Sequence, residues 1–397
     1  MTSIAPIAAT PTPAAVASRS RKLLFLVTED WYFVSHRLEL AIAARQAGYD
    51  VVVATRVNRH GDRITGAGLK LCPIAFNRGG LNPLEELRAL IDLVRVYRRE
   101  APDIVHHVAL KPIIYGSLVA RFLRIRGIVN ALAGFGYVFS SPGLSAKILR
   151  AIVKPLMMFA LGGNNSRLII QNRGDCEWIV REGWARAGAV NLIRGAGIDP
   201  EAYRRTSAAD DPPLVILPAR LLWEKGVGEF VEAARRLRAR GIKARFALVG
   251  KPDPANPASV GDSQVDAWVR EGVVEAWGWR DDMVDVFAQT QIVCLPSHHE
   301  GLPKSLLEAA ASGCAMVATD IPGCREIVRP GVTGWLVPAQ NAEVLAQALG
   351  EAIGQPALRE RYGATARALI ASDFSVSRVA AETIALYREL TEGGPPP

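Results

Sequence analysis

The feature that most constrains the fold of this chain is a repeated alternation of short apolar segments with longer amphipathic ones. In the first half, apolar runs of strand length occur at 22–28, 49–55, 103–109, 127–133, 166–172 and 190–195. Apolar residues at helical spacing occupy 35–48 and 83–100. Because short apolar strands that alternate with helices usually pair in parallel, we predict a parallel sheet with helices on both faces.

A second series of the same kind begins at residue 214. Its strands are predicted at 214–220, 244–250, 273–279, 292–297 and 315–319. The intervening segment, 199–213, is polar and contains prolines, and we interpret it as a linker. The predicted fold class is therefore α/β, with two doubly wound, Rossmann-like domains that face a cleft. Ligands of such sheets bind beyond the carboxyl ends of the strands, so the loops that follow strands are candidate sites.

The predicted organisation covers all 397 residues. It consists of a disordered tail at 1–20, an N-terminal domain at 21–198, the linker at 199–213, a C-terminal domain at 214–372, and a final helical segment at 373–397 that crosses back to the first domain. The tail lacks the basic start and compact apolar run of a signal peptide, and no apolar run is long enough to span a membrane. The five cysteines form no Cys-x-x-Cys pair, which favours reduced thiols in a cytosolic compartment.

The net charge of +8 is unevenly distributed. Residues 1–190 carry 25 Lys and Arg against 13 Asp and Glu, whereas residues 191–397 carry 22 against 26. The stretch 104–174 contains nine basic residues and no acidic one. This excess indicates an anionic partner, such as a phosphorylated substrate, a nucleic acid or an anionic membrane surface, and charge that serves only solubility is the alternative.

Two cations follow the first strand of the second series. In LPARLLWEKG (217–226), Arg220 and Lys225 lie between that strand and a helix that starts at Gly226. An arginine fork, a lysine charge and the N–H groups of a helix end together suit a diphosphate. Either cation by itself would be interpreted as an ordinary surface residue.

Two carboxylates stand out in SHHEGLPKSLLEAAASG (297–313). Glu300 precedes a helix whose first residue is predicted to be Pro303, and Glu308 lies inside that helix among apolar and small residues. A buried acid needs a partner, and a ribose diol is a suitable one; a solvent-facing glutamate is the ordinary alternative. Gly278 and Trp279 follow another strand, where an indole ring or a backbone edge can hold a nucleobase.

On these motifs, residues 22–390 resemble the family 4 retaining glycosyltransferases, which have the GT-B fold. The most specific part of the resemblance is the E-x7-E motif, here Glu300 to Glu308, within PSHHEGLPKSLLEAAASGCAMVATDIPGCREIV (296–328). The likeness is to bacterial members that build polysaccharides or glycans on a polyprenyl-diphosphate lipid.

The resemblance implies that the C-terminal domain binds a nucleotide-sugar donor. Arg220 and Lys225 match the pair that binds the donor's diphosphate and stabilises the leaving group, and Glu300 matches a glutamate near the donor sugar. The remaining implied donor contacts are the backbone of Gly301, Leu302 and Pro303 at sugar hydroxyls and phosphate, Glu308 at the ribose, and Gly278 with Trp279 at the base.

Enzymes of this family usually work without a metal or cofactor, and the chain contains no Asp-x-Asp motif. The resemblance therefore implies that Arg220, Lys225 and the helix N-terminus supply the electrostatic stabilisation. It also implies that the anomeric carbon keeps its configuration. One proposed route is front-face attack, in which the departing phosphate helps to deprotonate the acceptor and no protein nucleophile is needed.

The loop after the first strand, TEDWYFVSHR (28–37), departs from the family pattern because it has no glycine. The N-terminal domain is implied to bind the acceptor, and we assign His36 and Arg37, at a helix start, to that role. A structural role for His36 as a hydrogen-bonding residue of the helix N-terminus is the alternative.

A second departure lies in ALAGFGYVFSS (131–141), where Ala133 stands in the position at which many members have a histidine. Phe135 and Tyr137 of this loop are further candidate acceptor-binding residues. His107, at a strand end beside His106, is the candidate catalytic base, and a structural role for such a histidine is the alternative.

The segment 140–163 combines Leu, Ile, Met and Phe with Lys147, Arg150 and Lys154, which share one helical face. A basic amphipathic helix of this kind can lie in a membrane interface, with about 1 kcal/mol from each cation near an anionic leaflet. We expect a cytoplasmic protein that is peripheral to the inner face of the cell membrane. A core helix with a cationic outer face is the alternative.

The leading prediction is an enzyme that transfers a hexose or an N-acetylhexosamine from a UDP-sugar to a glycan acceptor linked to polyprenyl diphosphate. A sugar-nucleotide epimerase of the same fold and a catalytically silent nucleotide-sugar-binding scaffold are the alternatives. No nucleic-acid partner is expected, because the basic half has no interleaved aromatic platform. The donor sugar, the linkage and the oligomeric state stay open at this point.

Overall fold

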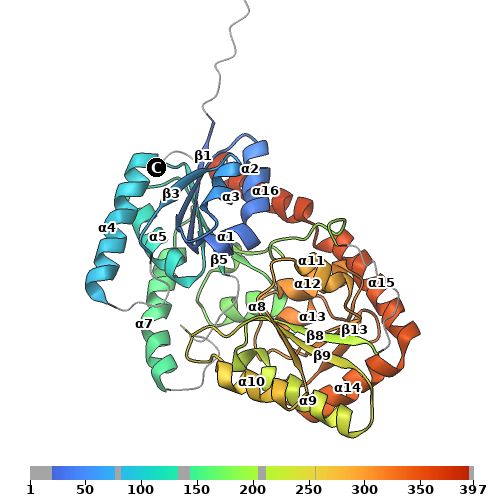
Figure 1. Cartoon of the computed structure of the whole chain (residues 1–397). Coiled ribbons are helices and arrows are strands. Elements are labelled where there is room, and N and C mark those ends of the chain that lie inside the picture. The colour runs from blue at the N-terminus through green and yellow to red at the C-terminus, as the bar shows by residue number, and fades with distance from the viewer. Residues whose placement is uncertain (1–19, 77–81, 133–143, 204–211, 255, 393–397) are drawn as a thin grey trace, which may run out of the picture.

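The computed structural model describes residues 20–76, 82–132, 144–203, 212–254 and 256–392, except for the side chains at 83 and 144–149. Figure 1 shows two lobes, each built around a sheet with helices on both faces. The predicted fold class, GT-B with two doubly wound α/β domains, is confirmed. The predicted tail, most of the predicted linker, Phe135, Tyr137 and the Lys147 side chain lie outside the described residues.

The first sheet has seven strands in the order β3-β2-β1-β4-β5-β6-β7, and all neighbours pair in parallel. Its strands are β1 (Lys22–Glu29), β2 (Asp50–Arg56), β3 (Lys70–Pro73), β4 (Ile104–Val108), β5 (Gly127–Leu132), β6 (Ser166–Ile170) and β7 (Val190–Leu192). The helices of this lobe are α1 (Asp30–His36), α2 (Leu38–Gln46), α3 (Gly61–Gly66), α4 (Pro83–Glu100), α5 (Leu110–Phe122), α7 (Leu144–Leu161), α8 (Arg173–Arg181) and the 3-10 turn η1 (Ala187–Ala189).

The second sheet has six strands in the order β10-β9-β8-β11-β12-β13, again parallel. Its strands are β8 (Leu214–Pro218), β9 (Arg245–Val249), β10 (Glu275–Gly278), β11 (Ile292–Leu295), β12 (Ala315–Thr319) and β13 (Gly334–Val337). The helices that follow them are η2 (Trp223–Lys225), α9 (Val227–Ala239), α10 (Asp262–Arg270), α11 (Met283–Ala288), α12 (Lys304–Ala311), α13 (Pro322–Arg325), α14 (Ala342–Gly354), α15 (Pro356–Asp373) and α16 (Val376–Glu392).

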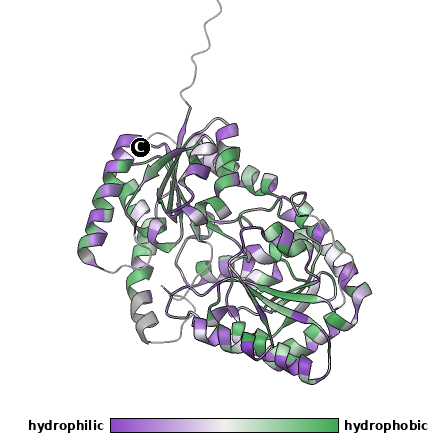
Figure 2. Cartoon of the chain, viewed as in Figure 1, coloured by the Kyte–Doolittle hydropathy of each residue, from purple (hydrophilic) through white to green (hydrophobic). Residues whose placement is uncertain are grey.

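Consecutive residues of the central strands bury their side chains on opposite faces of each sheet. In β1, Leu23 and Phe25 enter one core cluster, and Leu24 enters another. In β8, Ile216 and Leu217 are divided between two clusters in the same way. A strand with both faces buried is mostly apolar along its whole length, which explains the near-continuous apolar runs in the sequence. Figure 2 shows the hydrophobic strands inside each lobe and hydrophilic residues on the outer helices.

The elements not predicted from the sequence are mostly short. Strand β3 has four residues, begins at Lys70 and ends at Pro73, so it lacks the apolar run of a buried strand. It lies at an edge of the sheet, where a proline is tolerated. The predicted helix at 35–48 is in fact two helices, α1 and α2, which meet at Arg37, a residue with non-helical backbone (φ −134°).

The final helix, α16, lies on the first lobe although it follows the second in sequence (Figure 1). It packs against α2 and β5. Tyr387 of α16 contacts His106 of β4 through a hydrogen bond of 2.5 Å between the phenol oxygen and Nδ1. Arg167 of β6 forms an ion pair with Glu389 at 2.6 Å. The end of the chain therefore contributes to the core of the N-terminal lobe.

Polar contacts also join the lobes near the ends of the strands. Arg194 Nε lies 3.0 Å from Glu326 Oε2, and the backbone N–H of Arg173 donates to Glu326 Oε1 at 3.0 Å. Helix α8 packs against α13 at this point. As for membrane spans, none of the helices in the described ranges combines the length and the apolarity needed to cross a bilayer.

Candidate functional site

The predicted donor-binding residues lie at one edge of the second sheet. Strands β10, β9, β8 and β11 are consecutive neighbours and run parallel, so their carboxyl ends are adjacent. Arg220 follows β8, Trp279 follows β10 and Glu300 follows β11. Glu308 lies on α12, the helix that starts after Glu300. The structure thus brings these residues to the edge at which ligands of such sheets bind.

Lys225 and Glu300 form the central ion pair of this edge. Lys225 Nζ lies 2.6 Å from Glu300 Oε1, and the two side chains are only 18% and 14% exposed. Gly226 permits this approach: its φ is +71°, and a Cβ at that position would lie 2.2 Å from the carbonyl oxygen of Pro296. Any other residue would push the turn away from the end of β11. The glycine therefore places the lysine against the loop that carries Glu300.

Arg220 pairs with an acid that the sequence did not single out. Its Nη1 lies 2.7 Å from Asp253 Oδ2, in the loop after β9. The backbone N–H of Asp253 donates to Ser259 Oγ at 2.9 Å, which fixes this loop. Both predicted diphosphate-binding cations are thus held in place by carboxylates. Within the described residues, no three His, Cys, Asp or Glu side chains are close enough to hold a metal ion together.

Glu308 is buried, 8% exposed, as expected of an acid in a helix of apolar and small residues. Its Oε1 accepts from the Tyr203 hydroxyl at 2.9 Å and lies 3.1 Å from Lys304 Nζ. Burial raises the pKa of Tyr203, and the charge of Glu308 and its hydrogen bond raise it further. The protein therefore supplies a hydroxyl and a cation to this carboxylate, at positions that sequence reasoning missed.

The loop between Glu300 and α12 is held from both lobes. The Asn172 side-chain amide donates to the carbonyl oxygen of Gly301 at 2.7 Å. Gly323 packs so closely that a Cβ there would lie 2.5 Å from the carbonyl oxygen of Glu300. Leu302 is buried in the core, and Pro303 caps α12 rather than being its first residue. These contacts fix the backbone at the predicted sugar-binding loop.

Trp279 presents an open ring at the same edge. The side chain is 53% exposed, and its Nε1 donates to Asp281 Oδ1 at 2.9 Å. Lys251 Nζ lies 5.8 Å from the ring centre. The preceding residue, Gly278, accepts from the backbone N–H of Gly250 through its carbonyl oxygen at 2.8 Å, which ties the end of β10 to β9. An exposed, oriented indole of this kind offers a face on which a planar ring can stack.

His107, the predicted base, lies away from this edge. It is fully buried in β4, and both ring nitrogens are engaged: Nε2 with the Tyr97 hydroxyl at 2.9 Å and Nδ1 with Asn130 Oδ1 at 2.8 Å. Burial lowers the pKa of His107 to about 4. His106 is buried on the opposite face against Tyr387. The structure brings neither histidine to the donor-binding residues, and this geometry corresponds to the structural alternative.

The predicted acceptor residues His36 and Arg37 lie at the junction of α1 and α2. This junction faces α12 of the other lobe, because Lys304 Nζ contacts Ser35 Oγ at 3.3 Å. His36 stacks on the ring of Tyr32, with 4.2 Å between ring centres. The structure therefore places the junction beside Glu308, which is the ion-pair partner of Lys304.

Asp30, which the sequence analysis did not consider, fixes the start of α1. Its fully buried carboxylate accepts four backbone hydrogen bonds of 2.7–3.0 Å, from Trp31 and from 58–60. Burial raises the pKa of this carboxyl, but the four hydrogen bonds dominate and the net pKa is lowered. The only sequence signal was an acid that directly follows an apolar strand, and such an acid equally suits a ligand site.

Three cations of α7 were assigned to the membrane, and the structure describes the side chains of two of them, Arg150 and Lys154. Lys154 Nζ donates to the Glu182 carbonyl oxygen at 2.7 Å and lies over the Trp184 ring, so its charge is turned toward the protein. Arg150 is half-buried. The outer face is instead apolar, and its exposed residues are Ile152, Leu156, Met158 and Phe159.

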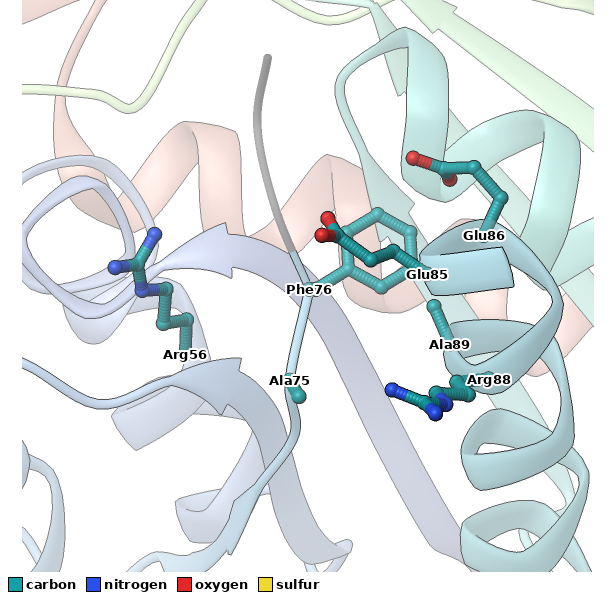
Figure 3. A pocket seen from close by; sticks show the side chains of 7 residues that line it. All are labelled: Arg56, Ala75, Phe76, Glu85, Glu86, Arg88 and Ala89. Atoms are coloured by element: carbon teal, nitrogen blue, oxygen red, sulfur yellow. The ribbon is translucent and has the colours of Figure 1, made fainter. Parts of the chain in front are cut away.

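A hollow of about 390 Å³ lies in the first lobe, beside the ends of β2 and β3 (Figure 3). Arg56 enters it from β2, and Glu85 and Arg88 enter it from α4. Arg56 is also 4.0 Å from Glu29, at the end of β1. The hollow thus has charged side chains of both signs and adjoins the end of β1, where α1 begins.

Comparison with known proteins decides the family. Residues 22–172 match a model described as glycosyl transferase 4-like, and residues 212–355 match one described as glycosyl transferases group 1. The chain belongs to this glycosyltransferase family. The predicted resemblance to family 4 is thereby confirmed, and the two matches cover most of both lobes.

Individual relatives are similar over much of their length. One is a Campylobacter jejuni N,N'-diacetylbacillosaminyl-diphospho-undecaprenol alpha-1,3-N-acetylgalactosaminyltransferase, 27% identical over 81% of this chain and 87% of the relative. Another is an Escherichia coli UDP-Gal:alpha-D-GlcNAc-diphosphoundecaprenol alpha-1,3-galactosyltransferase, 24% identical over 67% and 70%. Among solved structures, Anabaena HepE in complex with UDP has a TM-score of 0.72 at 20% identity and covers 92% of this chain and 99% of its own. The likeness to HepE shows that this chain has the same fold.

Proposed function

We propose that this glycosyltransferase moves a hexose or an N-acetylhexosamine from a UDP-sugar to a glycan acceptor linked to polyprenyl diphosphate. The observation that carries the proposal is the set of side chains at the carboxyl edge of the second sheet, namely Arg220, Lys225, Trp279, Glu300 and Glu308. The two bacterial relatives support the acceptor class, because both are named for sugars on diphospho-undecaprenol. HepE, which was solved with UDP-glucose, supports the donor class.

The donor would lie across this edge, with its ends at different residues. The uracil stacks on the exposed Trp279, and Glu308 accepts hydrogen bonds from the ribose hydroxyls. Arg220 and Lys225 bind the diphosphate, and the sugar lies against the loop that begins at Glu300. Asp253 holds Arg220 in position, and Glu300 holds Lys225 in position. The diphosphate would therefore bind in a defined position, because it shares each cation with a carboxylate.

The proposed reaction retains the configuration at the anomeric carbon and uses no metal. The bond from that carbon to the β-phosphate oxygen breaks as a bond to the acceptor hydroxyl oxygen forms on the same face. The acceptor proton passes to the departing phosphate, so that UDP leaves with the proton. Lys225 and Arg220 stabilise the charge that develops on the phosphate, as a preorganised electrostatic site does. His107 has no part in this route, because both of its ring nitrogens are engaged in the core.

The acceptor would reach the site from a membrane surface. The apolar outer face of α7 fits the interfacial region of a bilayer, and Arg121, which lies over the Phe159 ring at 4.4 Å, adds a cation at its edge. Helix α5 packs against both α4 and α7, and α4 exposes Leu84, Leu87 and Ile91. We propose that this side of the N-terminal lobe docks reversibly on the cytoplasmic leaflet.

A donor screen tests the proposed activity. Purified protein is incubated with individual UDP-sugars, with and without a diphosphate-linked glycolipid acceptor, and released UDP is measured. We expect UDP release that requires the acceptor and that is specific for one hexose or N-acetylhexosamine donor. Interconversion of UDP-sugars without acceptor would establish the epimerase alternative, and donor binding with no turnover on any acceptor would establish the scaffold alternative.

Vesicle flotation tests the proposed membrane binding. Wild-type protein should float with vesicles that contain anionic phospholipid, and Ile152→Ser with Phe159→Ser should reduce the floating fraction severalfold. Val284→Ser, which changes an exposed apolar residue of the other lobe, is the matched control. Equal flotation of all three proteins would refute the assignment of this face.

A further inference from the structure

A cation of the other lobe contacts the junction between α1 and α2. Lys304, the first residue of α12, lies with its Nζ 3.3 Å from Ser35 Oγ and 3.1 Å from Glu308 Oε1. Arg37 stands at the junction itself, two residues after Ser35. A lysine of the donor-binding lobe and an arginine of the other lobe are thus brought to the same place.

Arg37 is buried without an ionic partner. It is 4% exposed, and the one hydrogen bond from its guanidinium to the described residues runs from Nη1 to the carbonyl oxygen of His36 at 3.0 Å. Its Nε is buried and has no partner among the described residues. A buried guanidinium is normally paired with a carboxylate or a phosphate, because burying the charge unpaired costs several kcal/mol. The described ion pairs of the chain include none for Arg37.

Among the described residues, no acid forms an ion pair or a hydrogen bond with the Arg37 side chain. Asp30 and Glu29, at the end of β1, are directed to the loop after β2, where they accept hydrogen bonds from the backbone of 58–60 and from the Asn58 side chain. Two further acids of the sequence, Asp210 and Asp211, lie outside the described residues. Glu39, in the first turn of α2, is exposed to solvent, and Glu308 is engaged with Tyr203 and Lys304.

The pKa of His36 indicates that the charges of Lys304 and Arg37 act at one place. Burial lowers its pKa to about 3, and the charges of Lys304 and Arg37 contribute to the lowering. The ring is therefore neutral at physiological pH, and its buried Nδ1 has no hydrogen-bond partner among the described residues. Helix α2 also begins at Leu38, directly after the end of α1, so its first N–H groups lie at the same junction.

We propose that Arg37, Lys304 and the N-terminus of α2 form a subsite for a diphosphate anion, separate from the donor's diphosphate at Arg220 and Lys225. In the proposed reaction the anion is the diphosphate that links the acceptor glycan to its lipid. The inference therefore rests on the proposed function, and it adds Lys304, a residue of the donor-binding lobe, to the acceptor site. Binding of the acceptor would thus hold the two lobes together at Lys304.

The test compares Lys304→Met and Arg37→Lys with wild type. The matched control is Lys243→Met, which removes an exposed cation that precedes β9 at the opposite edge of the second sheet. Each protein is assayed with a diphosphate-linked acceptor and with the same glycan on a neutral alkyl chain. We expect Lys304→Met to raise KM for the diphosphate-linked acceptor at least tenfold, with less than a threefold change for the neutral one. Equal changes for both acceptors would overturn the proposal.

Binding of inorganic diphosphate tests this subsite independently of the proposed activity. Its binding is measured by calorimetry on wild type, Lys304→Met, Arg37→Lys and Arg220→Met. We expect wild type to bind diphosphate at the junction. Lys304→Met and Arg37→Lys should weaken this binding at least fivefold, and Arg220→Met should retain it. If no acceptor is glycosylated but this pattern is found, the proposed function fails and the subsite stands. Loss of binding in Arg220→Met alone, or no binding in wild type, would overturn the subsite. Inhibition that competes with the lipid acceptor, and not only with UDP-sugar, distinguishes the lipid-borne anion from free diphosphate.

Discussion

Replacing Lys225 with methionine removes the cation that contacts Glu300 and that we assign to the leaving phosphate. The pair is 2.6 Å long, and its side chains are 18% and 14% exposed, so the lysine acts in a partly dehydrated site. Loss of one preorganised group that stabilises developing charge typically costs about 2.7–4 kcal/mol, or 10²- to 10³-fold in kcat. We expect a kcat decrease in that range. The pair remains partly solvated, so the free energy of unfolding should change by only about 1 kcal/mol.

The assay is steady-state UDP release with saturating donor and acceptor, accompanied by thermal unfolding. Lys243→Met controls for loss of a positive charge from the same lobe and should retain wild-type kcat. Glu300→Gln in the Lys225→Met background is a second arm. Because Lys225→Met leaves an unpaired carboxylate beside the phosphate, the double variant should lose less than the product of the two single losses. A Lys225→Met enzyme with kcat within threefold of wild type would refute the reasoning.

Three further predictions concern other buried groups. Glu308→Gln should raise KM for the donor about tenfold, with a smaller effect on kcat, because a charge-assisted hydrogen bond to the ribose is worth about 1.5–3 kcal/mol; an unchanged donor KM would contradict this assignment. Asp30→Asn should lower the free energy of unfolding by about 2 kcal/mol in chemical denaturation, because four backbone N–H groups then face a neutral amide; an unchanged midpoint of denaturation would count against it. His107→Gln should leave kcat unchanged. Since the folded pKa of His107 is lowered to about 4, its contribution to stability is complete above the unfolded value near 6.5 and is lost as pH falls toward 4, so the variant should unfold with a weaker pH dependence in that window; a large kcat loss would restore His107 as the base.

The sequence predicted the architecture because the buried strands leave a strong pattern. Strand β8 and residues 23–27 of β1 are continuously apolar, since both faces of each sheet are covered. Helix α4 was predicted with its observed bounds from the helical spacing of its apolar residues, and the structure shows that Asn82 caps it and Pro83 starts it. Edge elements gave no such signal: β3 has a lysine and a proline in four residues, and it packs through few side chains. The break at Arg37 was missed because the apolar spacing continues through it.

The main residues of the candidate donor site could also be predicted from the sequence, for a different reason. Arg220, Lys225 and Glu300 follow strands that pair in one sheet, so their meeting follows from topology. The partners that tune them come from distant loops and have no local motif: Asp253 contacts Arg220 across 33 residues, and Tyr203 contacts Glu308 across 105. His107 shows the opposite error. A histidine near a strand end suits a base and a core network equally, and only the contacts with Tyr97 and Asn130 separate the two.

Product analysis tests the central claim most directly. The protein is incubated with the UDP-sugar found in the donor screen and a diphosphate-linked acceptor, in the presence of excess EDTA, and the new linkage is examined by proton NMR. The account predicts stoichiometric UDP and product, with the anomeric configuration of the donor retained. An inverted linkage, or transfer that requires an added divalent metal, would contradict the proposed mechanism, and absence of transfer to any diphosphate-linked acceptor would contradict the proposed function.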